Sequence, residues 1–282
     1  MLGRIKKKIT RAANQTFKSR KPLSYIPVID DKKFIFIGGL HRSGTSIMHR
    51  LLQEHPATSG FHDSGVIEDE GQHLQNVFKA AHEYGGPGEF AFHPDAHLTE
   101  ESELINERNK GLLLSQWGAY FDLQKKVLLE KSPPNLIRSR FLAKLFPNAR
   151  FVFLVRHPIA VSLATEKWSD KTITERLLHW LTAYSIMLND IKHVPGCIVI
   201  RYEDLVQTPS SYLNQICKLT GIEQFSPDEK IVNHNDKYFI EWGKRYAHDL
   251  ATLKLILPDN NKVLHQFGYT LDAPYVEEAP PL

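Results

Sequence analysis

The chain has 282 residues, of which 42% are hydrophobic, so it is long enough to bury one large core. Its net charge of +3 hides an asymmetry: residues 1–22 hold eight of the 35 Lys and Arg residues and no acid, which leaves 27 basic residues against 32 acidic ones beyond them. A mildly acidic body argues against a nucleic-acid-binding protein. We expect a basic flexible arm (1–22), a single domain (23–272) and a loose C-terminal tail (273–282).

Cysteine content and apolar runs bear on the compartment. Cys197 and Cys217 are too few for a disulfide framework, and both lie in apolar surroundings typical of buried thiols. No run approaches the roughly 18 consecutive apolar residues of a membrane span, and the N-terminus lacks the apolar segment of a secretory signal. These features predict a cytoplasmic protein. The arm is expected to be a solvated chain; the alternative is a basic helix in weak peripheral contact with an anionic membrane.

The first recognisable elements are a strand and a helix joined by glycines. Residues 34–37 are aromatic and β-branched, which predicts a buried parallel strand, and Ile47, Leu51 and Leu52 have helical spacing. The stretch between them, residues 38–46, reads Gly-Gly-Leu-His-Arg-Ser-Gly-Thr-Ser. Unpaired N–H groups at a helix N-terminus favour an anion, so this stretch predicts a phosphate-binding loop. The alternative is a structural turn of an α/β domain.

One position separates this loop from that of nucleoside-triphosphate-hydrolysing enzymes. Gly39, Gly44 and Ser46 stand where the triphosphate motif has its two glycines and its Ser or Thr, but Thr45 replaces the motif's Lys. The cation here is Arg42, two residues before Gly44. The loop therefore suits a monophosphate or sulfate ester held without magnesium. It disfavours a nucleotide kinase or NTPase, which would also need an acidic magnesium ligand at a strand end.

The rest of the chain alternates strand and helix patterns, which predicts a three-layer α/β fold with a central parallel sheet flanked by helices. Further strands are expected at 126–130, 151–155 and 197–202. Helices are expected at 99–119, opened by Thr99 and Glu101, and at 136–145, 172–193, 210–219 and 238–255. Arg156 follows the strand at 151–155, so it lies at the carboxyl edge of the sheet, where open α/β folds bind ligands.

Three blocks of sequence, in this order, resemble the sulfotransferases that use 3′-phosphoadenosine-5′-phosphosulfate (PAPS), the activated sulfate donor. They are residues 38–56; residues 128–162, with Leu-Glu-Lys-Ser-Pro and Phe-Pro-Asn-Ala-Arg-Phe before Val-Arg-His-Pro; and residues 201–222, which begin Arg-Tyr-Glu-Asp-Leu. The chain most resembles the general branch of tyrosyl-protein, carbohydrate and bacterial enzymes. The resemblance implies a P-loop-like fold and metal-free, in-line sulfuryl transfer to a hydroxyl of a carbohydrate, glycolipid, small metabolite or tyrosine.

The resemblance also implies which residues bind the donor. The loop would hold the 5′-phosphosulfate, and Arg156 would hold the 3′-phosphate. The loop residues concerned are Gly39, Arg42, Ser43, Gly44, Thr45 and Ser46. The family's 3′-phosphate Ser falls on Ala164 here, so we expect Ser162 to replace it, or Thr165, which shares its helix face.

Catalysis of sulfuryl transfer rests on positioning and on stabilising charge at the transferred group and the leaving phosphate. Arg42 is the first cation expected to do so. Lys131 is the second, by resemblance to the tyrosyl-protein branch. The alternative for Lys131 is a surface ion pair with Glu130 or another acid.

The acceptor also needs a base, and the segment after the first helix offers His62, Asp63, Glu68 and Glu70. Asp63 ranks first because it falls at the place of the catalytic Glu of the tyrosyl-protein branch. Glu68 ranks second: the family's frequent use of Glu as the base favours it, but residues 68–70 are expected to begin a helix whose dipole their charges would suit, which is a structural role. His62 ranks third, as a base that needs no pKa shift near neutral pH.

A metal site is not expected. Eight of the 14 histidines lie between His41 and His97, but none shows the spacing of a zinc site. Besides a kinase or NTPase, the remaining alternative to a sulfotransferase is a non-catalytic protein that binds a phosphonucleotide.

Overall fold

The computed structural model describes residues 21–23, 32–228, 230–246 and 261–272. Most of the expected basic arm and all of the C-terminal tail lie outside these residues. So does the second half of the helix expected at 238–255.

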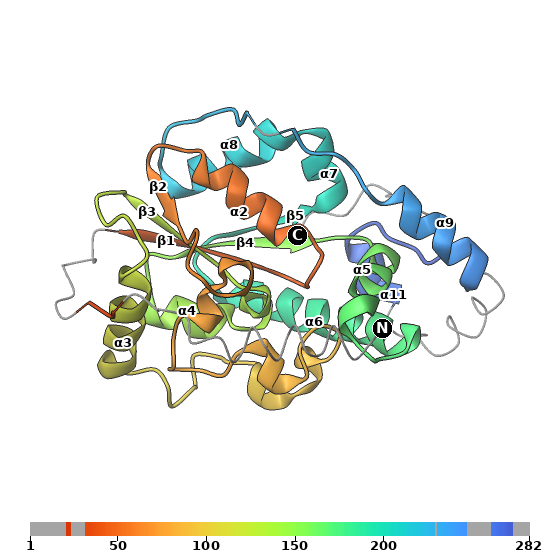
Figure 1. The fold of residues 1–282 in the computed structure, drawn as a ribbon, viewed down its shortest axis with the longest axis horizontal. Helices are drawn as coiled ribbons and strands as arrows, with labels where there is room; N and C mark the ends of the chain where they lie inside the picture. The colour runs from red at the N-terminus through yellow and green to blue at the C-terminus, as the bar shows by residue number, and fades with distance from the viewer. Residues whose placement is uncertain (1–20, 24–31, 229, 247–260, 273–282) are drawn as a thin grey trace.

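A sheet of five strands forms the centre of the described structure, and every neighbouring pair is parallel (Figure 1). The strand order is β2-β3-β1-β4-β5. The strands are β1 (Lys33–Gly39), β2 (Thr58–Gly60), β3 (Val127–Lys131), β4 (Arg150–Val155) and β5 (Cys197–Arg201). In the register, Ile37 lies beside Lys131, and Gly39 lies beside Leu154. The ends of β1, β3 and β4 therefore meet at one edge of the sheet.

Helices cover both faces of the sheet, which confirms the three-layer fold. In Figure 1, α2, α7 and α8 lie on one face, and α3, α4 and α6 lie on the other. The helices are α2 (Thr45–Gln53), α3 (Glu107–Gly118), α4 (Ser139–Leu145), α5 (Pro158–Thr165), α6 (Ile173–Asp190), α7 (Tyr202–Gln207), α8 (Pro209–Thr220), α9 (Asp236–Arg245) and α11 (Asn261–Gln266).

Alternation along the strands separates the core into two parts. Phe34 and Phe36 of β1 face the larger cluster, with residues of α3, α4 and α6, while Ile35 and Ile37 face a smaller cluster with residues of α2 and α8. Successive side chains of a strand point to opposite faces, so one fully buried strand fixes helices on both sides. This packing holds the loop after β1 at the sheet edge.

Two local predictions were wrong, and one strand was missed. The helix expected from residue 99 begins at Glu107, because Asn106 caps it: the Asn106 Oδ1 accepts from the Asn109 N–H at 2.9 Å. Residues 68–70 do not begin a helix, since Glu68 and Asp69 have φ of 54° and 49°. The short strand β2 was not predicted.

The segment between β2 and α3 folds instead into a series of short 3₁₀ turns. These are η1 (Ile67–Asp69), η2 (Gly71–His73), η3 (Ala81–Tyr84), η4 (Phe90–Phe92) and η5 (Pro94–Ala96). Three further turns lie later in the chain: η6 (Pro133–Ile137), η7 (Glu166–Trp168) and η8 (Ile191–His193).

Candidate active site

The loop between β1 and α2 is built around two glycines with positive φ. Gly39 has φ of 153°, and a Cβ there would lie 2.5 Å from the Leu154 carbonyl oxygen. Gly44 has φ of 108°, and a Cβ there would lie 2.9 Å from the Tyr202 ring. Gly44 is also the N-cap of α2 and supplies no side-chain cap. The loop therefore leaves the first N–H groups of α2 for a ligand.

These N–H groups border a cavity of about 250 Å³ at the carboxyl edge of the sheet. The loop between β1 and α2 (residues 40–44), which we call the donor loop, the turns that hold Glu68 and Glu70, the end of β4 and the start of α9 all contribute to its wall. The lining residues are His41, Arg42, Gly44, Thr45, Ser46, Ile47, Arg50, Glu68, Glu70, Pro133, Arg156, Trp168, Tyr202, His234, Lys237 and Tyr238. We call this the main cavity.

Arg156 lies directly against the loop, as its position after β4 predicts. Its Nη1 donates to the Arg42 carbonyl oxygen at 2.9 Å, and its guanidinium carbon lies 4.1 Å from the centre of the Tyr202 ring and 5.5 Å from that of Tyr238. Its Nη2 is buried and has no hydrogen-bond partner among the described residues. Burial lowers the pKa of the guanidinium, and the nearby Tyr202 and Glu203 partly offset that effect. A buried guanidinium with one N–H donor group that has no partner suits an anionic group in the main cavity.

Arg42 lies in the loop itself, between β1 and α2. Its backbone φ is 73°, and its guanidinium carbon lies 5.1 Å from the centre of the Trp168 ring. Trp168 belongs to η7, which follows α5, so the structure joins a residue from a distant part of the chain to the loop. The cation–π contact keeps the Arg42 side chain in the wall of the main cavity.

Lys131 ends β3 and is buried, with 1% of its surface exposed. Its Nζ lies 3.2 Å from Glu70 Oε1 and donates to the Glu68 carbonyl oxygen at 2.7 Å. The ion pair with Glu70 is therefore buried, and Lys131 does not pair with Glu130 at the surface. Glu130 instead accepts hydrogen bonds from Ser132 and Asn135, and burial raises its pKa to about 7.

The four base candidates separate into two pairs. Glu68 and Glu70 line the main cavity, and the Ser46 hydroxyl donates to Glu68 Oε2 at 3.3 Å. Asp63 and His62 do not line it: their side chains are 100% and 74% exposed and lie 3.7 Å apart. The structure therefore brings Glu68 and Glu70 to the wall of the main cavity and leaves Asp63, ranked first from the sequence, in solvent.

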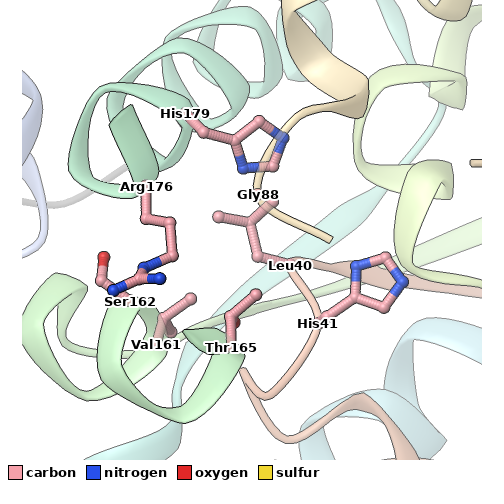
Figure 2. A pocket seen from close by; sticks show the side chains of 8 residues that line it. All are labelled: Leu40, His41, Gly88, Val161, Ser162, Thr165, Arg176 and His179. Atoms are coloured by element: carbon pink, nitrogen blue, oxygen red, sulfur yellow. The ribbon is translucent and has the colours of Figure 1, made fainter. Parts of the chain in front are cut away.

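Ser162 and Thr165 do not line the main cavity. They line a smaller pocket with Leu40, His41, Gly88, Val161, Arg176 and His179 (Figure 2). Both hydroxyls are buried and without a hydrogen-bond partner among the described residues. The structure therefore gives neither residue a place in the wall of the main cavity.

The aromatic and C-terminal part of the wall was not predicted from the sequence. Tyr202 directly follows β5, and this position at the carboxyl edge of the sheet could have identified it. Trp168, His234, Lys237 and Tyr238 belong to no local motif. Only the folded chain brings them to the loop.

His41 lines both the main cavity and the smaller pocket. Burial lowers its pKa to about 4, against a smaller opposing effect of Glu70. Its imidazole is therefore neutral at physiological pH and can hydrogen-bond without adding charge. Within the described ranges, no three His, Cys, Asp or Glu side chains come together in a way that could hold a metal ion.

Comparison with known proteins identifies similar chains. The sequence model of a family described as "Sulfotransferase family" matches residues 35–227. The chain is 27% identical over 210 residues to protein-tyrosine sulfotransferase A of Caenorhabditis elegans, which covers 71% of this chain and 52% of that protein. It is 25% identical over 244 residues to protein-tyrosine sulfotransferase 2 of Gallus gallus, which covers 83% of this chain and 62% of that one. The chain thus spans about half to three-fifths of the length of these curated relatives.

A solved structure is similar as well. The sulfotransferase STF1 of Mycobacterium tuberculosis superposes with a TM-score of 0.46 at 16% identity, over 79% of this chain and 72% of that one.

The predicted cytoplasmic location is wrong. The named relatives are protein-tyrosine sulfotransferases, and their class contradicts that assignment. The prediction rested on a low cysteine count and on missing apolar segments, which do not identify a compartment. Among the described residues, no helix has the length and apolar character needed to cross a bilayer.

Proposed function

We propose, because this chain belongs to the sulfotransferase family, that it transfers a sulfuryl group from PAPS to the hydroxyl group of an acceptor. The observation that carries the proposal is the contact between Arg156 and the donor loop at one edge of the sheet, with a buried Nη2 left over. PAPS carries two anionic ends, and the main cavity has one cationic site for each. Arg42 and the N-terminus of α2 form the first site, and Arg156 forms the second.

The residues present fit this donor. The backbone of Gly44, Thr45 and Ser46 opens α2 without a side-chain cap, so its N–H groups can hold the 5′ end. Tyr202 and Tyr238 flank the Arg156 guanidinium and keep it in the wall. The bound donor would supply the activated sulfuryl group, and the residues of the chain position it and stabilise charge on it.

We assign the base to Glu70 and the role of its positioning residue to Lys131. Glu70 borders the main cavity, and Lys131 Nζ and the Gln72 side-chain amide hold its two oxygens. A carboxylate fixed in this way can take the acceptor's proton while the Arg42 side chain stabilises negative charge on the transferred group. Glu68 is the second candidate, because its carboxylate borders the same cavity.

The acceptor is a hydroxyl-bearing molecule. Because the relatives are named protein-tyrosine sulfotransferases, tyrosine in a protein is the first acceptor to test. Carbohydrate, glycolipid and small-metabolite hydroxyls are the alternatives. No metal enters the proposal, since the cations that face the donor are side chains of the chain itself.

Nucleotide binding tests the donor assignment. Adenosine 3′,5′-bisphosphate, the desulfated donor, should raise the melting temperature of the protein in the presence of EDTA. ATP with Mg²⁺ should raise it far less, because Thr45 stands where a triphosphate loop needs Lys. A stronger effect of ATP with Mg²⁺ would favour the kinase or NTPase alternative. Binding of the bisphosphate without any transfer to acceptors would favour the non-catalytic one.

A further inference from the structure

A buried chain of hydrogen bonds extends from Arg156 to the C-terminal part of the protein. Arg156 Nε donates to Asn235 Oδ1 at 2.8 Å, and Asn235 Nδ2 donates to Glu203 Oε1 at 2.6 Å. The other oxygen of Glu203 accepts from the Tyr269 hydroxyl at 2.7 Å. Asn235, Glu203 and Tyr269 are 3%, 6% and 0% exposed. Water therefore cannot replace a lost partner in this network at low cost.

Asn235 occupies a position that few side chains could fill. One atom of its amide must accept from Arg156, and the other must donate to Glu203, so these two partners fix the orientation of the amide. An Asp in this place would keep the acceptor and set a second carboxylate against Glu203. A Leu would have a similar shape and leave Arg156 Nε and Glu203 Oε1 without this partner.

The same residue anchors the start of α9. Asn235 is its N-cap, and its carbonyl oxygen accepts from the Tyr238 N–H at 2.8 Å. Tyr238 in turn borders the Arg156 guanidinium. Asn235 therefore connects the C-terminal wall of the main cavity to the guanidinium, although it lies beyond the stretch that matches the family, which ends at residue 227.

We propose that Asn235 is a positioning residue for recognition of the donor's 3′-phosphate, and that Glu203 holds it in the working orientation. This inference rests on the proposed function, because it assigns Arg156 to the 3′-phosphate. Of the guanidinium's donors, Nε is engaged by Asn235 and Nη1 by the Arg42 carbonyl, which directs Nη2 to the ligand. Loss of Asn235 would let the guanidinium rotate about its stem and misdirect Nη2.

The test compares two nucleotides that differ only in the 3′-phosphate. Dissociation constants for adenosine 3′,5′-bisphosphate and adenosine 5′-phosphate are measured by calorimetry on the wild-type chain and on Asn235→Leu and Asn235→Asp. Each variant should bind the bisphosphate at least ~10-fold more weakly and should bind the 5′-phosphate within about twofold of wild type. A general loss of stability would weaken both nucleotides together, so the ratio of the two constants isolates the positioning role.

Two matched variants serve as controls. Asn233→Asp adds the same carboxylate two residues away, at an exposed site where Asn233 Oδ1 already accepts from the Asn235 N–H at 3.0 Å, and should leave the ratio unchanged. Glu203→Gln removes the charge of Glu203 and keeps an oxygen that can accept from Asn235. It should retain most of the discrimination, since the proposal depends on the direction of the hydrogen bond.

The outcomes separate the two proposals. If wild type does not bind the bisphosphate, the proposed function fails. If wild type binds it and Asn235→Leu keeps the wild-type ratio, the positioning role is wrong. Loss of discrimination in Asn235→Asp alone, with Asn235→Leu normal, would also overturn it, because simple charge repulsion would then explain the effect.

Discussion

Lys131 and Glu70 form an ion pair at the wall of the main cavity, with 3.2 Å between Nζ and Oε1 and almost no exposed surface on either side chain. Lys131 Nζ also donates to the carbonyl oxygen of Glu68, so one ammonium group fixes both the carboxylate and the backbone turn that presents it. Removing either partner from such a pair leaves a buried charge, which is costly. In the proposed mechanism, the pair therefore fixes the position of the base, Glu70.

The first prediction concerns that base. Glu70→Gln should lower turnover on the order of 10²-fold or more with donor binding preserved, because the amide cannot take a proton. Asp63→Asn is the matched control in the same segment and should keep near-normal turnover, since its side chain is fully exposed. Steady-state rates and bisphosphate affinity are measured on both variants. Normal turnover in Glu70→Gln with a large loss in Glu68→Gln or Asp63→Asn would move the base to that residue.

The second prediction concerns Arg156. Arg156→Ala should weaken adenosine 3′,5′-bisphosphate by on the order of 10²-fold and adenosine 5′-phosphate much less, because a charge-assisted contact to one phosphate is lost. Calorimetric titration of both nucleotides measures the difference. An equal loss for the two would mean that Arg156 does not bind the 3′-phosphate.

The third prediction compares two glycines. Gly44→Ala should destabilise the protein by about 1–3 kcal/mol and weaken donor binding, because φ is 108° and the new Cβ would meet the Tyr202 ring. Gly243→Ala lies inside α9 with nothing within 4 Å of the new Cβ, and should instead stabilise by about 0.5–1 kcal/mol. Urea unfolding gives both values. The same sign for the two changes would contradict this account of the loop.

The fourth prediction concerns acid stability. Burial lowers the pKa of His41 and His73 to about 4, and of His49 and His179 to about 3, from an ordinary value of 6.5. Because the folded-state values are depressed, this part of the stability is present above pH 6.5 and is lost as pH falls toward 4. Each histidine should lower the free energy of unfolding as pH falls through that range, because the unfolded chain binds a proton that the folded chain excludes.

Urea unfolding between pH 7.5 and 5 measures that slope. His49→Gln should lower the number of protons taken up on unfolding by about one, since the Gln side chain does not titrate. A free energy of unfolding that stays constant from pH 6.5 to 5 would show that these histidines are not buried as described.

The central strand, loop and helix could be predicted because each carries its own local signal. Aromatic and β-branched residues mark β1, glycines mark the loop, and helical spacing marks α2. The position of Arg156 could be predicted because it directly follows a parallel strand, and the carboxyl ends of parallel strands lie at one edge of the sheet.

The positions of the acidic residues at the main cavity could not be predicted in the same way. Asp63, Glu68 and Asp69 all have φ near 50°, and these turns direct Asp63 into solvent and Glu70 toward the cavity. Non-glycine residues rarely adopt this conformation, and no side-chain pattern signals it. Asn235 and Trp168 reach the site only through long-range packing, which the local sequence does not encode.

Transfer of labelled sulfate from PAPS tests the central claim most directly. The wild-type chain is incubated with [³⁵S]PAPS, EDTA and a set of tyrosine peptides, oligosaccharides and glycolipids, and both the labelled product and the released adenosine 3′,5′-bisphosphate are measured. We expect label on at least one hydroxyl-bearing acceptor, equal amounts of released bisphosphate, and a loss of on the order of 10²-fold or more in Glu70→Gln. Tight binding of the bisphosphate with no label on any acceptor would contradict the claim.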